Sequence, residues 1–186
     1  MEKYKKGNMV LEIHQDIDPI NPRKEYYTLG VMYCWHHRYI LGDEQPKQDL
    51  CDFYLQELSD NGHVLNLYLY DHGDLSMSTT PFSDRWDSGQ VGFIHMLKAV
   101  QIKEGFTDEQ ALEYLKEEVE TYNQYLSGEI YGFELYTLEA CETCGHMEKT
   151  EGNSCWGFYG HDHKKSGLLD CAGIDSLDDW KEEEDV

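Results

Sequence analysis

The segment from Thr107 to Gly128 constrains the fold more than any other part of the sequence. Thr107 and Gln110 match the capping box, in which each side chain caps the backbone N–H of the other residue. Gly128 stands where the C-terminus of a helix is expected. Between them, apolar side chains recur every three or four residues and form one stripe: Leu112, Leu115, Val119, Tyr122 and Leu126. The sequence therefore predicts a long amphipathic helix over residues 108–126.

Most of the other predicted elements are strands. Alternation of apolar and polar residues indicates strands at 8–14 and 63–70. Further short runs indicate strands at 28–36, 75–79, 90–98, 130–138 and 154–159, and a second, shorter helix is expected at 48–58. Together these elements predict an α+β fold, with a mixed, mostly antiparallel sheet packed against the one long helix. A length of 186 residues favours one domain, which we place at 1–160, followed by an acidic C-terminal tail at 161–186.

The chain is strongly acidic. It has 37 Asp and Glu against 15 Lys and Arg, a formal charge of −22. Binding to DNA or RNA depends on cations that neutralise phosphates, so we expect no direct nucleic-acid partner and no anionic membrane surface. A negative field suits a partner protein with a basic groove, because complementary fields raise the rate of encounter. The alternative role for the charge is solubility alone.

Targeting signals are not evident. The longest uncharged run, Tyr26 to His37, is shorter than the ~18–20 apolar residues that a membrane span needs. Glu12 interrupts the apolar stretch after the N-terminal lysines, which makes a poor signal peptide. We therefore expect a reducing, cytoplasmic setting. The six cysteines are then predicted to be thiols or metal ligands before disulfides.

Acidic residues are densest at 104–142, which hold eleven acids and one base. On the predicted helix Glu109, Glu113 and Glu117 share one face, and Glu120 extends the row. Their axial spacing of about 6 Å is of the same order as the spacing of phosphates along a DNA strand. We predict that these four glutamates bind a partner by imitating a nucleic-acid backbone. A solvated helix face is the alternative.

The sharpest chemical pattern is Cys141-Glu-Thr-Cys144-Gly-His146. Two cysteines separated by two residues and followed by glycine can wrap two thiolates around a tetrahedral Zn²⁺. We expect Cys155 and His146 to complete a structural zinc site in a zinc-knuckle-like β-hairpin loop at 139–155. His161, His163 and Cys171 are alternative ligands. Exposed thiols or a redox pair are the alternative to a metal.

Evidence for a catalytic site is weaker, and no catalytic residue is predicted. Histidines and carboxylates near strand ends can form a metal-dependent hydrolase site, and such residues are present: His36, His37, Asp71, His72 and Asp87. Separate His and Asp residues are, however, commonly structural. Cys34 as a nucleophile, with His72 or His95 as its base, has no local motif to support it.

Several short segments within residues 16–160 stand out together: Asn21-Pro-Arg23, Leu29-Gly30, Cys34 to Tyr39, Leu41-Gly42-Asp43, Tyr70-Asp71-His72, WDSGQVGFI at 86–94, Glu118 to Tyr122 with Gln124 to Leu126, and CWGFYG at 155–160. With these segments the chain resembles a family of mostly uncharacterised proteins found in phages and mobile elements of Firmicutes. The resemblance implies a phage setting, and so the cytoplasm of a bacterial host. It supplies no catalytic residues.

Small acidic phage proteins often inhibit host defence. By this analogy we expect an inhibitor that binds a host defence nuclease and blocks its loading with nucleic acid. An anti-CRISPR protein aimed at a type II effector is the candidate, because that enzyme has basic channels for guide and DNA. The alternatives are a metal-dependent enzyme acting on nucleotides or nucleic acid, and a phage accessory module without an inhibitory role.

Overall fold

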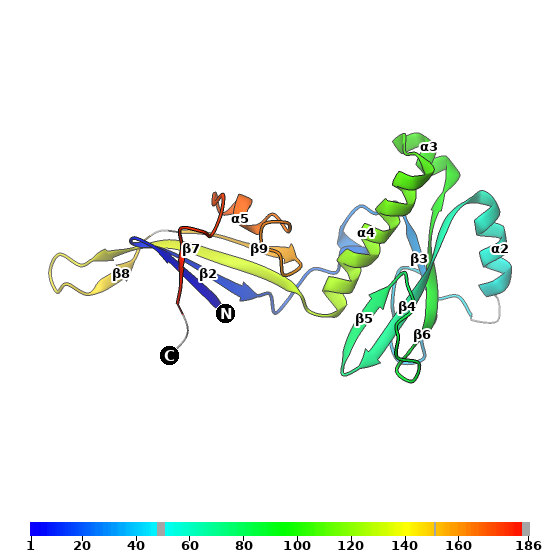
Figure 1. Cartoon of the computed structure of the whole chain (residues 1–186), viewed down its shortest axis with the longest axis horizontal. Helices are drawn as coiled ribbons and strands as arrows, with labels where there is room; N and C mark the ends of the chain where they lie inside the picture. The colour runs from blue at the N-terminus through cyan, green and yellow to red at the C-terminus, as the bar shows by residue number, and fades with distance from the viewer. Residues whose placement is uncertain (48–50, 151, 184–186) are drawn as a thin grey trace. The chain divides into compact units, whose positions relative to one another are not determined.

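The chain folds into two compact units in the computed structural model, which describes residues 1–47, 51–150 and 152–183 (Figure 1). Unit 1 comprises Met1–Ile20 and Gly128–Val186, and unit 2 comprises Asn21–Ser127. The sequence predicted one domain over 1–160, whereas the structure has these two compact units. The chain leaves the first sheet after Gln15 and returns to it at Ile130, and the segment between is long enough to bury a core of its own.

Unit 2 is a four-stranded antiparallel sheet with the strand order β3-β6-β4-β5. Its longest helix, α4 (Asp108–Leu126), packs against the sheet through Ala111, Leu115, Val119 and Tyr122, which join the core of the unit. Thr107 and Gln110 form the capping box at its start. The strands are β3 (Val31–Cys34), β4 (Gly62–His72), β5 (Asp74–Ser78) and β6 (Ser88–Leu97).

Three shorter helices complete unit 2: α1 (Pro22–Glu25), α2 (Cys51–Asn61) and α3 (Lys98–Glu104). Helix α1 was not predicted; the side chain of Asn21 caps it by accepting the Arg23 N–H at 2.9 Å. The helix predicted at 48–58 corresponds to α2, and its first three residues lie outside the described range. Helix α3 follows β6 directly and ends at Gly105, whose φ of 76° suits glycine.

Unit 1 is a six-stranded antiparallel sheet with the order β10-β1-β2-β7-β8, in which β9 also pairs with β7. The long strand β7 pairs with β2 along one edge; on its other edge it pairs first with β9 and then with β8. The strands are β1 (Glu2–Lys6), β2 (Met9–Gln15), β7 (Ile130–Ala140), β8 (Met147–Lys149), β9 (Asn153–Tyr159) and β10 (Lys181–Glu182).

The segment predicted as an acidic tail is part of unit 1. Leu168 and Leu169 of α5 (Leu168–Cys171), with Ala172 and Ile174, pack against Leu11, Ile13 and Phe133 of the sheet. The sequence predicted a separate tail at 161–186, whereas four apolar residues of this segment are buried in the core of unit 1. Residues 184–186 lie outside the described range.

The predicted α+β class with mostly antiparallel strands is confirmed, although the strands form two sheets and not one. Alternation along a strand indicates which face is buried but does not identify the neighbouring strand. No helix among the described residues combines the length and the apolar character that crossing a lipid bilayer requires.

Candidate partner-binding surface

The four predicted partner-binding glutamates lie on the solvent-facing side of α4. Glu109, Glu113, Glu117 and Glu120 are all exposed, because the helix buries its opposite side, which carries Ala111, Leu115, Val119 and Tyr122. Lys116 is the one base in the helix sequence, and its Nζ lies 3.1 Å from Glu113 Oε2. An exposed pair of this kind contributes little free energy. Among the described residues, the other three carboxylates have no ion-pair partner.

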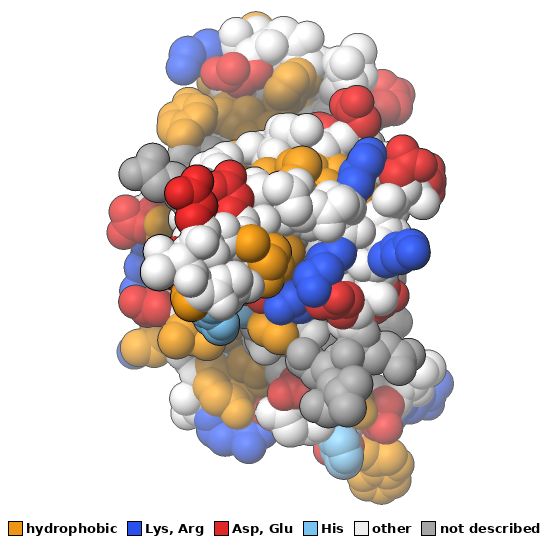
Figure 2. All heavy atoms as spheres, turned by 90° about the vertical axis from the view of Figure 1, so that its left-hand side faces the viewer, with side chains coloured by type: hydrophobic (Ala, Val, Ile, Leu, Met, Phe, Trp, Pro, Cys, Tyr) orange, Lys and Arg blue, Asp and Glu red, His pale blue; other side chains and the backbone are white. Residues whose placement is uncertain are grey.

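Unit 1 is also acidic, but many of its carboxylates are already paired. Basic side chains, Lys or Arg, lie among Asp and Glu side chains on the face shown in Figure 2. The ion pairs in this unit include Lys3 with Glu12, Lys5 with Glu183, and Lys6 with Asp179. The exposed face of α4 is thus the clearer candidate for a continuous negative surface.

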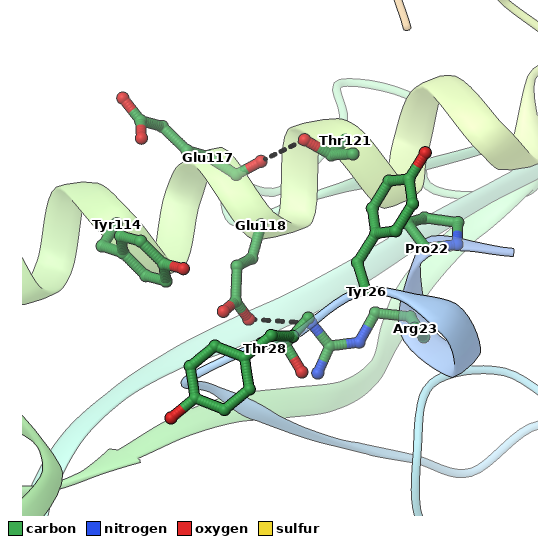
Figure 3. Close-up of a pocket in the computed structure, with 9 residues that line it drawn as sticks. Pro22, Arg23, Tyr26, Thr28, Tyr114, Glu117, Glu118 and Thr121 are labelled. Carbon is green, nitrogen blue, oxygen red and sulfur yellow. Dashed lines mark hydrogen bonds and ion pairs between the residues drawn. The ribbon is translucent and has the colours of Figure 1, made fainter. Parts of the chain in front are cut away.

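A tyrosine-lined pocket lies beside this face of α4, with a volume of about 220 Å³ (Figure 3). Tyr26 and Tyr27 follow α1 and are 45% and 77% exposed, while Tyr114 and Glu117 come from α4. Burial, reinforced by Glu118 and other nearby carboxylates, raises the pKa of Tyr114, so its phenol stays protonated. Aromatic rings next to carboxylates attract cations.

Arg23 and Glu118 also line the pocket and form a buried ion pair (Figure 3). Arg23 Nη1 donates to Glu118 Oε2 at 2.7 Å, and Nε donates to Asp43 Oδ1 at 3.1 Å. Nη2 donates to Asp43 and to the carbonyl of Gly30. The Arg23 side chain is only 2% exposed and each of its three nitrogens already donates within the protein, so the guanidinium is poorly placed to bind an anionic ligand.

The same ion-pair cluster fixes the backbone between Leu29 and Met32. Glu118 Oε1 accepts the N–H groups of Leu29 and Gly30, and Asp43 Oδ2 accepts that of Met32. Four of the short segments singled out in the sequence, around 21–23, 29–30, 41–43 and 118–122, therefore meet here. Their contacts within the chain give them a structural role, since one arginine and two carboxylates hold α1, β3 and α4 together.

The four predicted zinc ligands are not assembled in one place. Cys141, Cys144 and His146 lie in the turn between β7 and β8, whereas Cys155 pairs with Phe133 in the β7–β9 ladder. Cys141 is eight residues beyond Phe133, roughly 26 Å along an extended chain. The physical reason is the length of β7, which carries the turn away from Cys155. Among the described residues, no group of three or more His, Cys, Asp or Glu is placed to hold a metal.

The alternative ligands also lie away from the turn. Burial raises the pKa of Cys171, and so does the thiol of Cys155, which lies within hydrogen-bonding reach. His161 lies 3.3 Å from Glu129, and His163 lies 3.1 Å from Glu2. These contacts bring Cys155 and Cys171 together, but they do not complete a site with Cys141 and Cys144.

The hydrolase candidates form separate pairs. His72 Nδ1 lies 2.8 Å from Asp87 Oδ2 with both side chains exposed, and Asp71 is bound by Arg38. His36 Nδ1 accepts the backbone N–H groups of two following residues and so stabilises a turn. These pairs are typical of surface polar contacts.

Cys34 does not suit a nucleophilic role. It is 1% exposed, and burial raises the pKa of its thiol to about 12. The thiolate, which is the reactive form, is therefore scarce at neutral pH.

Sequence reasoning missed the pocket tyrosines. Tyr26 and Tyr27 lie in a segment whose path the sequence did not predict. Tyr114 carried a weak signal, because it lies on the helix between the apolar stripe and the acidic row. Comparisons with protein-family models, curated proteins and solved structures found no match to the chain.

Proposed function

We propose that the protein inhibits a nuclease by binding its basic nucleic-acid groove through the exposed face of α4. The observation that carries the proposal is the row of four exposed glutamates on a helix with a single lysine. The bound groove is then closed to nucleic acid. The target we propose is a bacterial defence nuclease, with a type II CRISPR effector as the candidate, since its channels hold guide and DNA by cationic contacts.

The scaffold under the glutamates supports this proposal. The helix is capped at its start, packs on the sheet through four buried residues, and is tied to α1 by the Arg23–Glu118 pair. Charges on such a helix are already in position, so binding costs little conformational entropy. A flexible acidic segment would lose more entropy for the same contacts.

The tyrosine pocket gives the surface a second type of contact. A lysine or arginine side chain from the groove would place its stem against Tyr26, Tyr27 and Tyr114, and its cation near the carboxylates. This contact depends less on salt than exposed ion pairs do, because it includes apolar burial. The pocket thus adds specificity to a surface that would otherwise act through charge alone.

The test is a triple charge reversal, Glu109→Lys, Glu113→Lys and Glu117→Lys, assayed for inhibition of guide-loaded and guide-free nuclease. Three lost contacts of about 0.5 kcal/mol each weaken binding on the order of tenfold. Repulsion between the introduced lysines and the basic groove adds to this loss. The matched control is Glu57→Lys, Asp60→Lys and Asp74→Lys, which makes the same change in net charge at exposed sites elsewhere in unit 2.

Equal potency of the two triple variants would exclude the α4 face. Tyr27→Ala tests the pocket separately, and we expect it to weaken inhibition while leaving the salt dependence of binding nearly unchanged. If inhibition does not depend on ionic strength in any variant, the electrostatic basis of the proposal is wrong.

A further inference from the structure

The turn between β7 and β8 has the local geometry of a metal-binding knuckle. Cys141 N–H donates to the carbonyl of His146 at 2.7 Å, and Gly145 N–H donates to the carbonyl of Cys141 at 2.8 Å. Gly145 has a φ of 72°, which glycine adopts without strain. The backbone N–H groups of Thr143 and Cys144 and the Cys144 thiol lie within hydrogen-bonding reach of the Cys141 sulfur.

This knuckle is at the exposed end of a two-stranded hairpin. The pairing of β2 with β7 stops at Thr137, so residues beyond Leu138 pair only with β8 (Figure 1). Cys144 and every residue from 142 to 149 are exposed. An isolated two-stranded hairpin is marginally stable in water, and a bound metal would stabilise its end.

Although His146 lies in the same turn, no third His, Cys, Asp or Glu among the described residues joins Cys141 and Cys144 in a group that could hold a metal. The knuckle therefore supplies only two of the four ligands that a tetrahedral zinc needs. The other described cysteines of unit 1, Cys155 and Cys171, contact each other near the opposite end of β7. The site is therefore incomplete within the described part of one chain. A second copy related by a two-fold axis would bring an identical pair of cysteines to the same ion.

We propose that Cys141 and Cys144 bind Zn²⁺ together with the same two cysteines of a second copy, forming a four-cysteine site that joins two hairpin ends. The inference is independent of the nuclease proposal. Each knuckle orients two sulfurs, and four thiolates with no water ligand make a structural zinc site. Glu142 and Glu148 near the turn, and the formal charge of −22 per chain, repel a second copy. Dimerisation should therefore require the metal.

The experiment is a titration of the reduced, metal-free full chain with Zn²⁺, followed by sedimentation velocity and thiol counting. We expect a monomer without metal, a dimer at one Zn²⁺ per two chains, and protection of two thiols per chain. Co²⁺ in place of Zn²⁺ should give the absorption of a tetrahedral four-thiolate site. Cys144→Ser should abolish the dimer and the metal binding together.

The matched control is Cys171→Ser, a cysteine in the same unit that the proposal leaves out, and this variant should still dimerise. Circular dichroism shows whether each variant is folded. Three results would overturn the proposal: one Zn²⁺ bound per monomer, a zinc-dependent dimer that survives Cys144→Ser, or a Cys141–Cys144 disulfide that forms readily in air and leaves Zn²⁺ unbound after reduction.

Discussion

Each unit has a cluster of ion pairs that involves a largely buried charged side chain, Arg23 in unit 2 and Glu12 in unit 1, and these two clusters have opposite compositions. In unit 2 one base, Arg23, lies between two carboxylates, Asp43 and Glu118. In unit 1 one carboxylate, Glu12, accepts from two bases, Lys3 and Lys149, and from the hydroxyl of Tyr136 at 2.8 Å.

The clusters also differ in the solvent exposure of their side chains. The side chains of Arg23 and Glu118 are 2% and 8% exposed, whereas those of Lys3 and Lys149 are 25% and 54% exposed. A lysine can rotate its ammonium into solvent when its partner is lost, but the enclosed guanidinium and carboxylate cannot. Acidity alone therefore does not identify a binding surface, because Glu12, Asp43 and Glu118 are used within the fold.

Of the substitutions at the two clusters, Arg23→Met should cause the largest loss of unfolding free energy. The substitution leaves Asp43 and Glu118 without their cation, and breaking a buried pair in this way costs about 3–5 kcal/mol of unfolding free energy. Urea unfolding measures the loss, and hydrogen exchange should locate it in β3 and α4. Arg85→Met, at an exposed arginine, should change stability by less than about 0.5 kcal/mol.

A compensating variant sharpens this prediction. Arg23→Met combined with Asp43→Asn and Glu118→Gln removes the unpaired charges, so part of the lost stability should return. If the triple variant is less stable than Arg23→Met alone, hydrogen bonding by the carboxylates to the backbone matters more than their charge.

A smaller loss, about 1–3 kcal/mol, is expected for Glu12→Gln in unit 1, because the freed lysines can reach solvent. Burial by itself raises the pKa of Glu12, but hydrogen bonds from Lys3, Tyr136 and Lys149 outweigh burial and lower it from 4.5 to about 2. The native state therefore binds fewer protons than the unfolded state. The contribution of Glu12 is complete above about pH 4.5 and is lost as the pH falls to about 2.

Unfolding experiments on wild type and Glu12→Gln across this range test the pH dependence. The difference in stability between the two proteins should be constant above about pH 5 and should shrink steadily below it. A difference that stays the same down to about pH 2.5 would show that the Glu12 carboxylate is not held by its neighbours.

Some of the fold was readable from the sequence because the information is local. The limits of α4 follow from Thr107, Gln110 and the apolar spacing, and its acidic face follows from the four-residue spacing of glutamates alone. The division into two units is not local, since it depends on pairs such as Leu11 with Leu135. The burial of Leu168 and Leu169 likewise depends on a sheet built mostly from distant segments.

The candidate sites divide in the same way. The Cys141–Cys144 turn is a local pattern, and the structure places it in a tight hairpin turn. Whether Cys155 can join Cys141 and Cys144 as a zinc ligand depends on the length of β7. The sequence predicted that this strand ends at 138, but it continues to Ala140. The tyrosine pocket combines Tyr26, which follows α1, with Tyr114 of α4. Because these residues are far apart in the sequence, no local pattern predicts the pocket.

Replacing one tyrosine by phenylalanine at each cluster should cost less unfolding free energy than the changes above. Tyr122→Phe removes the hydroxyl that accepts the Gly42 N–H at 3.1 Å, and Tyr136→Phe removes the donor to Glu12. We expect about 1–2 kcal/mol for Tyr122, because a backbone donor loses its partner, and about 0.5–1 kcal/mol for Tyr136, because two lysines still serve Glu12. Urea unfolding of both variants shows which one loses more stability. A larger loss for Tyr136→Phe than for Tyr122→Phe would contradict the prediction.

The smallest effect is expected for Lys149→Met. Its ammonium lies 3.3 Å from Glu12 and 3.9 Å from the ring centroid of Tyr136, but the side chain is 54% exposed. Exposed pairs contribute about 0–1 kcal/mol, and methionine keeps the apolar contact with the ring. Stability at neutral pH should therefore change by less than about 0.5 kcal/mol, while the pKa of Glu12 rises and acid unfolding begins at a higher pH. If Lys149→Met costs as much as Lys3→Met at neutral pH, burial of the cation does not set its contribution, and the contrast between the two clusters has another cause.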